Sequence, residues 1–145
     1  MDIAFVAGFG PIARDPGATL DFWAGTLGLA FHELAPGYHH SENLEGVKAF
    51  ALWPLDQAAE ATFGTDVWPE DRPVPQAWIE LEVSSPAAVA EAVEELRGKG
   101  QEILVDAHEE PWGQTTARLM SPEGLLVGIS YLPSFHEDAD PTAQI

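Results

Sequence analysis

The stretch PWGQTTARLMSPEGLLVGISYLP, residues 111–133, decides the predicted fold of this chain. It is typical of a β-hairpin, with one strand over residues 115–120 and a return strand over residues 125–131. In the turn between them, Pro122 presets the φ angle that a type I or II turn needs, and Gly124 accepts a positive φ at low cost. The return strand is apolar on both faces, which predicts a central position in a sheet.

Two helix starts of the same kind indicate an internal repeat. Asp15-Pro16 and Ser85-Pro86 each place an N-cap residue before a proline at the first helical position, and they lie 70 residues apart. Each start is followed by an apolar helical stripe and then by several strands, so each half is a β-α-β-β-β unit. We predict an α+β fold in which two such modules pair into a cupped mixed β-sheet with helices on the outside.

The chain divides into predicted elements and segments as follows. The expected buried stripes are Leu20, Trp23 and Leu27 in the first helix and Val89, Val93 and Leu96 in the helix after Ser85. Other expected elements are strands at 3–12, 29–34, 38–41, 47–53, 77–83 and 103–105, and a helix over 55–63 that stops at Gly64. We expect one domain over residues 1–132, with modules at about 1–64 and 77–132, a linker at 65–76, and a loosely ordered acidic tail at 133–145.

The composition narrows the function classes. The chain has 145 residues, enough for one domain with its own core, and no cysteine, which excludes disulfides and thiolate chemistry. A formal charge of −18, from 24 acidic and 6 basic residues, would repel a phosphate backbone and excludes nucleic acid as a partner. No apolar run is long enough to span a membrane and no secretory signal is visible, so we expect a cytoplasmic protein without a membrane partner.

Several short motifs occur in a characteristic order along the chain. They are Ile12-Ala13-Arg14-Asp15, Phe22-Trp23 and Leu27-Gly28 in the first half, and Trp78 to Val83, Pro111-Trp112-Gly113 and Ser121-Pro122-Glu123-Gly124 in the second. With these motifs the chain resembles, over roughly residues 3–132, the glyoxalase / bleomycin-resistance / extradiol-dioxygenase superfamily, also called vicinal oxygen chelate proteins. It is most similar to the metal-free bleomycin-resistance-like or glyoxalase-like branch. The resemblance implies a homodimer.

The resemblance also implies where a metal would be held. Enzymes of this family bind a divalent metal in the cup through four His or Glu side chains, one from each of four strands. The corresponding positions here are Gly8, Trp78, the strand 47–53 and Gly128. None of them carries an imidazole or a carboxylate, which such metals require. We therefore expect no metal at the family position, and we assign no other cofactor and no catalytic residue.

Aromatic residues stand near these positions instead, which suits stacking of a flat or hydrophobic guest. Polar anchoring would come from carboxylates, an arginine and a histidine pair on neighbouring strands. The expected ligand-binding residues are Trp78, Trp53, Trp112, Tyr38, His39, His40, Phe50, Glu80, Glu82, Arg118, Met120 and Gly128.

Three functions remain open. The first, which we favour, is metal-free binding of a hydrophobic or aromatic small molecule such as an antibiotic or secondary metabolite. The acidic chain favours a cationic ligand of this kind. The second is a glyoxalase-like lyase, isomerase or dioxygenase, either with displaced metal ligands from His39, His40 and Glu42 or with a cup carboxylate as acid or base. The third is a structural or regulatory protein whose cup is plugged, with Trp78 as the plug.

Overall fold

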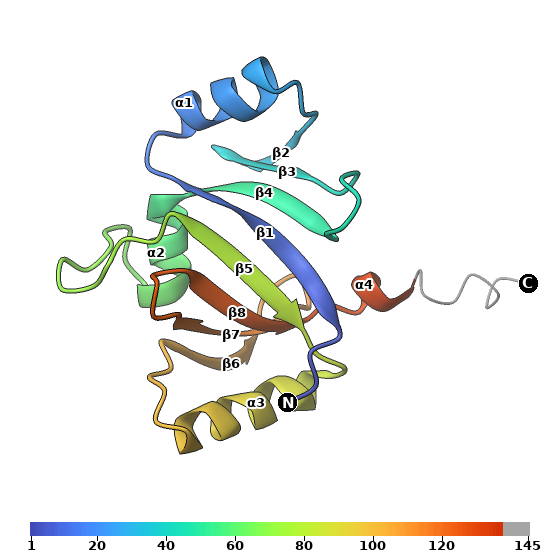
Figure 1. Ribbon diagram of the computed structural model, residues 1–145, viewed down its shortest axis with the longest axis vertical. Coiled ribbons are helices and arrows are strands. Elements are labelled where there is room, and N and C mark those ends of the chain that lie inside the picture. The colour runs from blue at the N-terminus through green and yellow to red at the C-terminus, as the bar shows by residue number, and fades with distance from the viewer. Residues whose placement is uncertain (138–145) are drawn as a thin grey trace, which may run out of the picture.

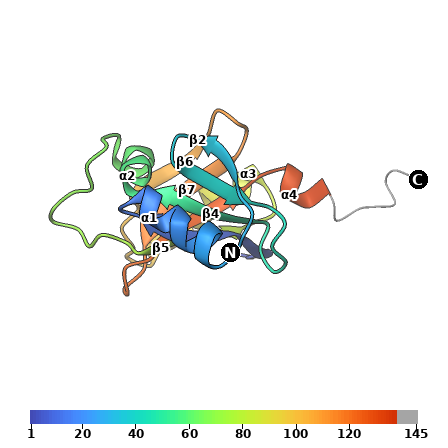
Figure 2. The same ribbon diagram turned by 90° about the horizontal axis from the view of Figure 1, so that it is seen from above.

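The computed structural model describes residues 1–137 and contains one mixed sheet of eight strands in the order β2-β3-β4-β1-β5-β8-β7-β6 (Figure 1). Seen from above, the edge strands β2 and β6 rise toward the same side, so the sheet is curved (Figure 2). The strands are β1 Phe5–Ala13, β2 His32–Ala35, β3 Tyr38–Ser41, β4 Ala49–Pro54, β5 Ala77–Glu82, β6 Val105–Glu109, β7 Thr115–Met120 and β8 Leu126–Tyr131. The helices are α1 Pro16–Leu20, the π-helical segment η1 Asp21–Thr26, α2 Leu55–Phe63, α3 Pro86–Gly98 and α4 Ser134–Glu137.

The two halves of the sheet are built alike and meet at its centre. β1 pairs antiparallel with β5, while β4 runs parallel to β1 and β8 runs parallel to β5. The strand order is therefore mirrored about the junction between β1 and β5. The terminal hairpin is confirmed: β7 and β8 pair antiparallel with Arg118 opposite Gly128, and β8 is an interior strand.

Both predicted helix starts are capped as expected. The Asp15 side chain accepts a hydrogen bond from the backbone N–H of Ala18, and the Ser85 side chain accepts one from Ala88. The first helix departs from the prediction after its first turn, because α1 continues into the π-helical η1. Its expected buried stripe is wrong: neither segment contains a buried residue, and Leu27 is 51% exposed.

Two apolar clusters lie on opposite faces of the sheet. On the outer face, α3 packs Val89 and Val93 against Ala117 and Ile129 of the hairpin. On the inner face, α2 packs Ala58 and Ala59 against a cluster that includes Trp78 and Leu126. The α+β architecture with a cupped sheet is as predicted, and α3 lies on the outside, but α2 lies across the concave face.

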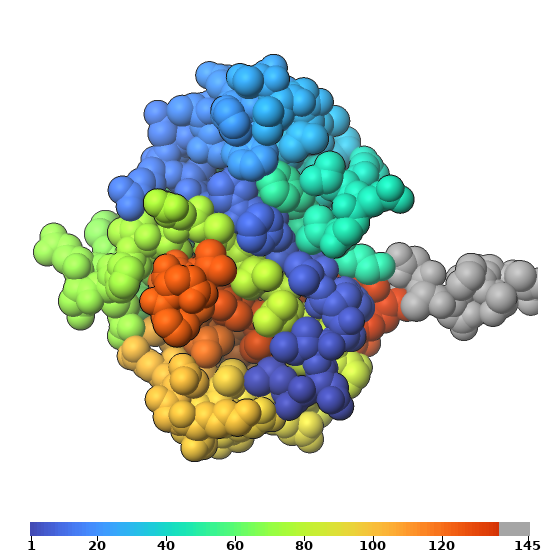
Figure 3. All heavy atoms as spheres, viewed as in Figure 1, coloured from blue at the N-terminus to red at the C-terminus, as the bar shows by residue number. Residues whose placement is uncertain are grey.

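The predicted linker and the first part of the predicted loose tail both make defined contacts. The segment 65–76 protrudes from the side of the molecule (Figure 3), yet Trp68 within it is buried and donates its indole N–H to the carbonyl of Pro73 at 2.9 Å. The first part of the tail forms α4, whose His136 Nε2 lies 2.8 Å from Glu82 Oε2. The remainder of the predicted tail, 138–145, lies outside the described residues. Within the described part, no helix has the length and apolarity needed to cross a membrane.

Candidate ligand-binding site

The concave face of the sheet, called the cup below, brings together much of the predicted ligand site. Side chains two residues apart on a strand share a face, so Trp78, Glu80 and Glu82 of β5 project to the same side. Trp78 belongs to the inner apolar cluster, and Trp53, Tyr38 and Met120 pack against that cluster. Facing residues of neighbouring strands also share a side, which places Arg118 and Gly128 in the cup.

The wide ring of Trp78 occupies the space above Gly8. A Cβ atom on Gly8 would lie 2.6 and 2.7 Å from Cζ3 and Cη2 of that ring. The Trp78 indole N–H donates to the carbonyl of Ala51 at 3.3 Å, and its ring meets Trp53 edge-on with centroids 5.8 Å apart. The lack of a side chain at position 8 is therefore what leaves room for the indole beside β1.

The Glu80 side chain occupies the space above Gly128 in the same way. A Cβ atom on Gly128 would lie 2.8 Å from Glu80 Cγ. Gln114 donates to Glu80 Oε1 at 3.0 Å, and Trp112 donates its indole N–H to Gln114 Oε1 at 2.8 Å. Burial raises the pKa of the Glu80 carboxyl, and the positive charge of Arg118 only partly opposes this shift. Glu80 is thus a half-buried acid that holds its proton more tightly than an exposed glutamate.

The pKa of the Tyr38 phenol is shifted by burial and by nearby carboxylates. Burial raises the pKa of Tyr38, and the negative charges of Glu80 and Glu42 raise it further. Tyr38 therefore stays a neutral phenol at every physiological pH, able to donate a hydrogen bond inside the cup.

Arg118 lies at the centre of a second polar group. Its guanidinium is 5.5 Å from the centroid of the Trp53 ring, donates to Glu110 Oε2 at 3.3 Å, and donates to the α2 carbonyl of Ala61 at 3.3 Å. Thr116 also donates to Glu110 Oε2, at 3.2 Å. The sequence analysis considered a pairing of Arg118 with Glu80 or Glu82, whereas Glu110, which it missed, is the carboxylate that Arg118 contacts.

α2 fills the cup from its open side. Ala58 and Ala59 are fully buried, Trp78 is only 5% exposed, and the hydroxyl of Thr62 is buried without a hydrogen-bond partner. The small alanine side chains allow the helix to approach the aromatic floor closely. In this form of the protein the centre of the cup is packed, as the third predicted function requires.

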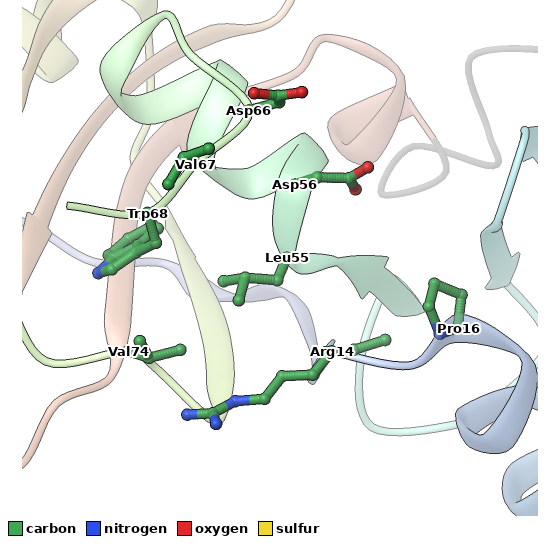
Figure 4. Close-up of a pocket in the computed structure, with 9 residues that line it drawn as sticks. Arg14, Pro16, Leu55, Asp56, Asp66, Val67, Trp68 and Val74 are labelled. Atoms are coloured by element: carbon green, nitrogen blue, oxygen red, sulfur yellow. The ribbon is translucent and has the colours of Figure 1, made fainter. Parts of the chain in front are cut away.

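An open pocket of about 450 Å³ lies at the mouth of the cup, beside α2 (Figure 4). Leu55, Trp68 and Val74 form part of its wall and also belong to, or pack against, the inner cluster that contains Trp78. The sequence analysis did not assign these residues to a site. The available signal was a single tryptophan, Trp68, in a segment otherwise rich in proline and charge. The full lining is Ala13, Arg14, Pro16, Leu55, Asp56, Asp66, Val67, Trp68 and Val74.

Other expected ligand residues lie away from the cup centre. Phe50 and His39 lie on the opposite face: Phe50 contacts Trp23, and His39 faces Leu52 in the sheet. Adjacent strand residues alternate in direction, and the strand 47–53, apolar apart from Lys48, gave no clear alternation to show which face Phe50 takes. His40 shares the side of Ala51 but lies out on β3, next to the edge strand.

Glu82 and Trp112 also differ from the expectation. Glu82 is fully buried and accepts hydrogen bonds from the Ser130 hydroxyl and the Leu132 N–H, both at 2.7 Å, besides its contact with His136. It therefore holds the C-terminal segment. Trp112 lies at a turn with 63% of its surface exposed, and it reaches the cup only through its hydrogen bond to Gln114.

The residues at the metal positions do not fit a metal. Gly8 and Gly128 offer no donor, and the space above them holds the Trp78 ring and the Glu80 stem. The β4 strand Ala49–Pro54 has no donor side chain. His39 and His40 each lie 3.7 Å from a different carboxylate, Glu33 and Glu42 respectively. Within residues 1–137, no three His, Asp or Glu side chains are grouped so as to hold a metal ion.

Fold and sequence together define the class of protein. The family model of the Glyoxalase/Bleomycin resistance protein/Dioxygenase superfamily matches residues 9–129. The chain belongs to this superfamily, as its motifs and mirrored sheet suggested. No curated protein sequence matches it significantly.

Solved structures share the fold at low sequence identity. A superfamily member from Vibrio splendidus 12B01 superposes with a TM-score of 0.60 and 13% identity, covering 90% of this chain and 100% of the other. A protein from Legionella pneumophila described as NAD-dependent benzaldehyde dehydrogenase gives 0.57 and 17%, covering 86% and 97%. A methylmalonyl-CoA epimerase variant from Streptomyces coelicolor, in complex with 2-nitronate-propionyl-CoA, gives 0.52 and 17%, covering 90% and 98%. At these identities the likeness concerns the fold alone.

Proposed function

We propose that this protein binds a hydrophobic or aromatic small molecule without the help of a metal. The observation that carries the proposal is the replacement of metal donors in the cup: the Trp78 ring covers Gly8, and the Glu80 side chain covers Gly128. Aromatic rings in such a place bind flat apolar guests by stacking and by burial of apolar surface. An antibiotic or another secondary metabolite has this chemistry.

The guest site in this form is the pocket at the mouth of the cup. Trp68, Leu55 and Val74 provide an apolar wall there, and the same cluster continues inward to Trp78. A guest that binds deeper must displace α2, whose hold on the sheet includes the hydrogen bond from Arg118 to Ala61. Binding at the pocket needs no such movement.

Tryptophan fluorescence tests this proposal with a panel of aromatic small molecules. We expect quenching by a guest, and we expect Trp68→Leu to weaken binding about tenfold, because an indole wall contributes a kcal/mol or more of apolar contact. Trp23→Leu is the matched control, because Trp23 lies on the opposite face against Phe50. Trp78→Ala should also weaken binding. Equal affinities in all three variants would contradict the site.

Metal content tests the metal-free part of the proposal separately. Protein purified without chelators is analysed for Zn, Fe, Ni and Mn by mass spectrometry. One tightly held ion per chain would overturn it.

A second candidate function is metal-free acid–base catalysis by Glu80. The observation in its favour is that Glu80 is half-buried in the cup, beside Gly128, and that burial raises the pKa of its carboxyl above the usual range. The activity would be the exchange of a proton beside a carbonyl group, followed by NMR in D₂O. Glu80→Gln should abolish exchange while guest binding persists; exchange at the same rate in that variant would exclude the role.

We also propose a homodimer. Phe9, Phe22, Leu27 and Leu34, all in the first half of the chain, are each at least 40% exposed. Where exposed apolar side chains gather into one patch, that patch marks a surface that another protein chain covers. Sedimentation analysis should give twice the chain mass, and a monomer at micromolar concentration would contradict this expectation.

A further inference from the structure

We propose that the pocket at the mouth of the cup takes an amphipathic anion, with its carboxylate or similar acid group on Arg14 and its apolar body against Trp68, Leu55 and Val74. This inference rests on the proposed function and names the chemical class of the guest. The net charge of −18 would by itself favour a cationic guest, whereas the lining of this pocket favours an anionic one.

Within residues 1–137, Arg14 differs from the other arginines in having no carboxylate within ion-pair distance. Arg72 pairs with Glu102 at 2.8 Å, Arg97 with Asp106 at 2.6 Å, and Arg118 with Glu110 at 3.3 Å. Among residues 1–137, Arg14 makes no ion pair, although the chain contains 24 acidic residues. An unpaired guanidinium at a pocket wall offers its planar set of N–H donors to a carboxylate of a guest.

The arrangement of charges in the pocket separates the two ends of a guest. Figure 4 shows the Arg14 guanidinium on the side of Val74, while the carboxylates of Asp56 and Asp66 lie on the other side and Leu55 stands between. The anionic group of a guest is therefore drawn to the Arg14 end and kept from the aspartate end. This fixes the direction in which the guest lies.

The apolar wall suits a ring of moderate size. Trp68 is held in place by its hydrogen bond to Pro73 and by edge-on contact with Phe63, with ring centroids 4.9 Å apart. A volume of about 450 Å³ holds a bicyclic aromatic acid. Because the Trp68 indole is fixed before binding, stacking on it costs little ordering entropy.

Isothermal titration calorimetry with naphthalene-1-acetate and its neutral amide, naphthalene-1-acetamide, tests the inference. The two probes have nearly the same shape and differ in charge. Wild-type protein should bind the acid about tenfold or more tightly than the amide, the range for a hydrogen-bonded charge. Arg14→Gln should remove this difference. Arg97→Gln, which removes the same charge from the exposed surface of α3, should preserve it.

The outcomes separate this inference from the proposed function. If acid and amide bind equally and Arg14→Gln behaves like Arg97→Gln, the anion inference is wrong while small-molecule binding stands. Tighter binding of naphthalene-1-methylammonium than of the acid would likewise overturn it and would assign the pocket to cations through Asp56 and Asp66. Absence of heat with all three probes at millimolar concentration would overturn the anion inference, while the fluorescence panel decides the proposed function. A thermal melt of Arg14→Gln equal to wild type excludes unfolding as the cause.

Discussion

Replacement of Gly8 by alanine should destabilise the protein through its effect on Trp78. The new Cβ would lie 2.6 Å from the ring, against about 3.5–4.0 Å for carbon atoms in good contact. The ring must move by about 1 Å, which strains its hydrogen bond to Ala51 and its contact with Trp53. Overpacking of this kind costs about 1–3 kcal/mol. For a chain of this length each kcal/mol lowers Tm by roughly 3–4 °C.

A double-mutant cycle followed by urea denaturation checks the cause. In a Trp78→Leu background the smaller side chain leaves room for the methyl group, so Gly8→Ala should cost nearly nothing and the coupling should be about 1–3 kcal/mol. Gly98→Ala is the matched control, because a Cβ at the end of α3 meets no atom within 4 Å. That variant should keep or slightly raise stability. A Gly8→Ala protein as stable as Gly98→Ala, or additive losses in the cycle, would refute the packing of Trp78 above Gly8.

Three further outcomes follow from the structure. Arg118→Met should lower the free energy of unfolding by about 2 kcal/mol in urea denaturation, because it leaves the half-buried Glu110 without the Arg118 guanidinium; an unchanged midpoint would show that the pair contributes nothing. Burial raises the pKa of Glu80, so the folded protein binds that proton more tightly than the unfolded chain, and stability should fall as pH rises from the ordinary value of 4.5 toward the raised one. In Glu80→Gln this fall should be absent from melts across that pH range, and an identical pH profile would exclude the effect. Ser85→Ala should cost about 1 kcal/mol by thermal unfolding, because the first turn of α3 loses the cap of its Ala88 N–H; no loss would mean that water replaces the cap.

Local signals in the sequence predicted most of the elements because the physics that forms them is local. The helix over residues 55–63 ends where it was expected, since Gly64 takes a φ of 75° that other residues adopt at a cost. Asp15 and Ser85 cap their helices because each side chain accepts a hydrogen bond from a backbone N–H of the first turn. The final hairpin followed from its turn and from the apolar character of β8.

The placement of α2 could not be predicted from the sequence, because helical periodicity does not say which face of a sheet a helix covers. Ala58 and Ala59 fit against Trp78 only once the sheet has curved. The faces of the strand residues depended on the same limit. The alternation along β5 predicted that Trp78 and Glu80 share one face, whereas the strand around Phe50, apolar apart from Lys48, carried no clear alternation. Glu110 and Trp68 lie in irregular segments, where contacts depend on the whole fold.

The two repeats are joined by the pairing of β1 with β5 and also by a side-chain contact, the hydrogen bond from Arg118 to the carbonyl of Ala61. A helix that belongs to the first repeat is held by a side chain of the second, and its alanines pack on Leu126 of that repeat. We therefore expect neither repeat to be stable as an excised fragment. The protein should melt in a single cooperative transition, with equal calorimetric and van't Hoff enthalpies.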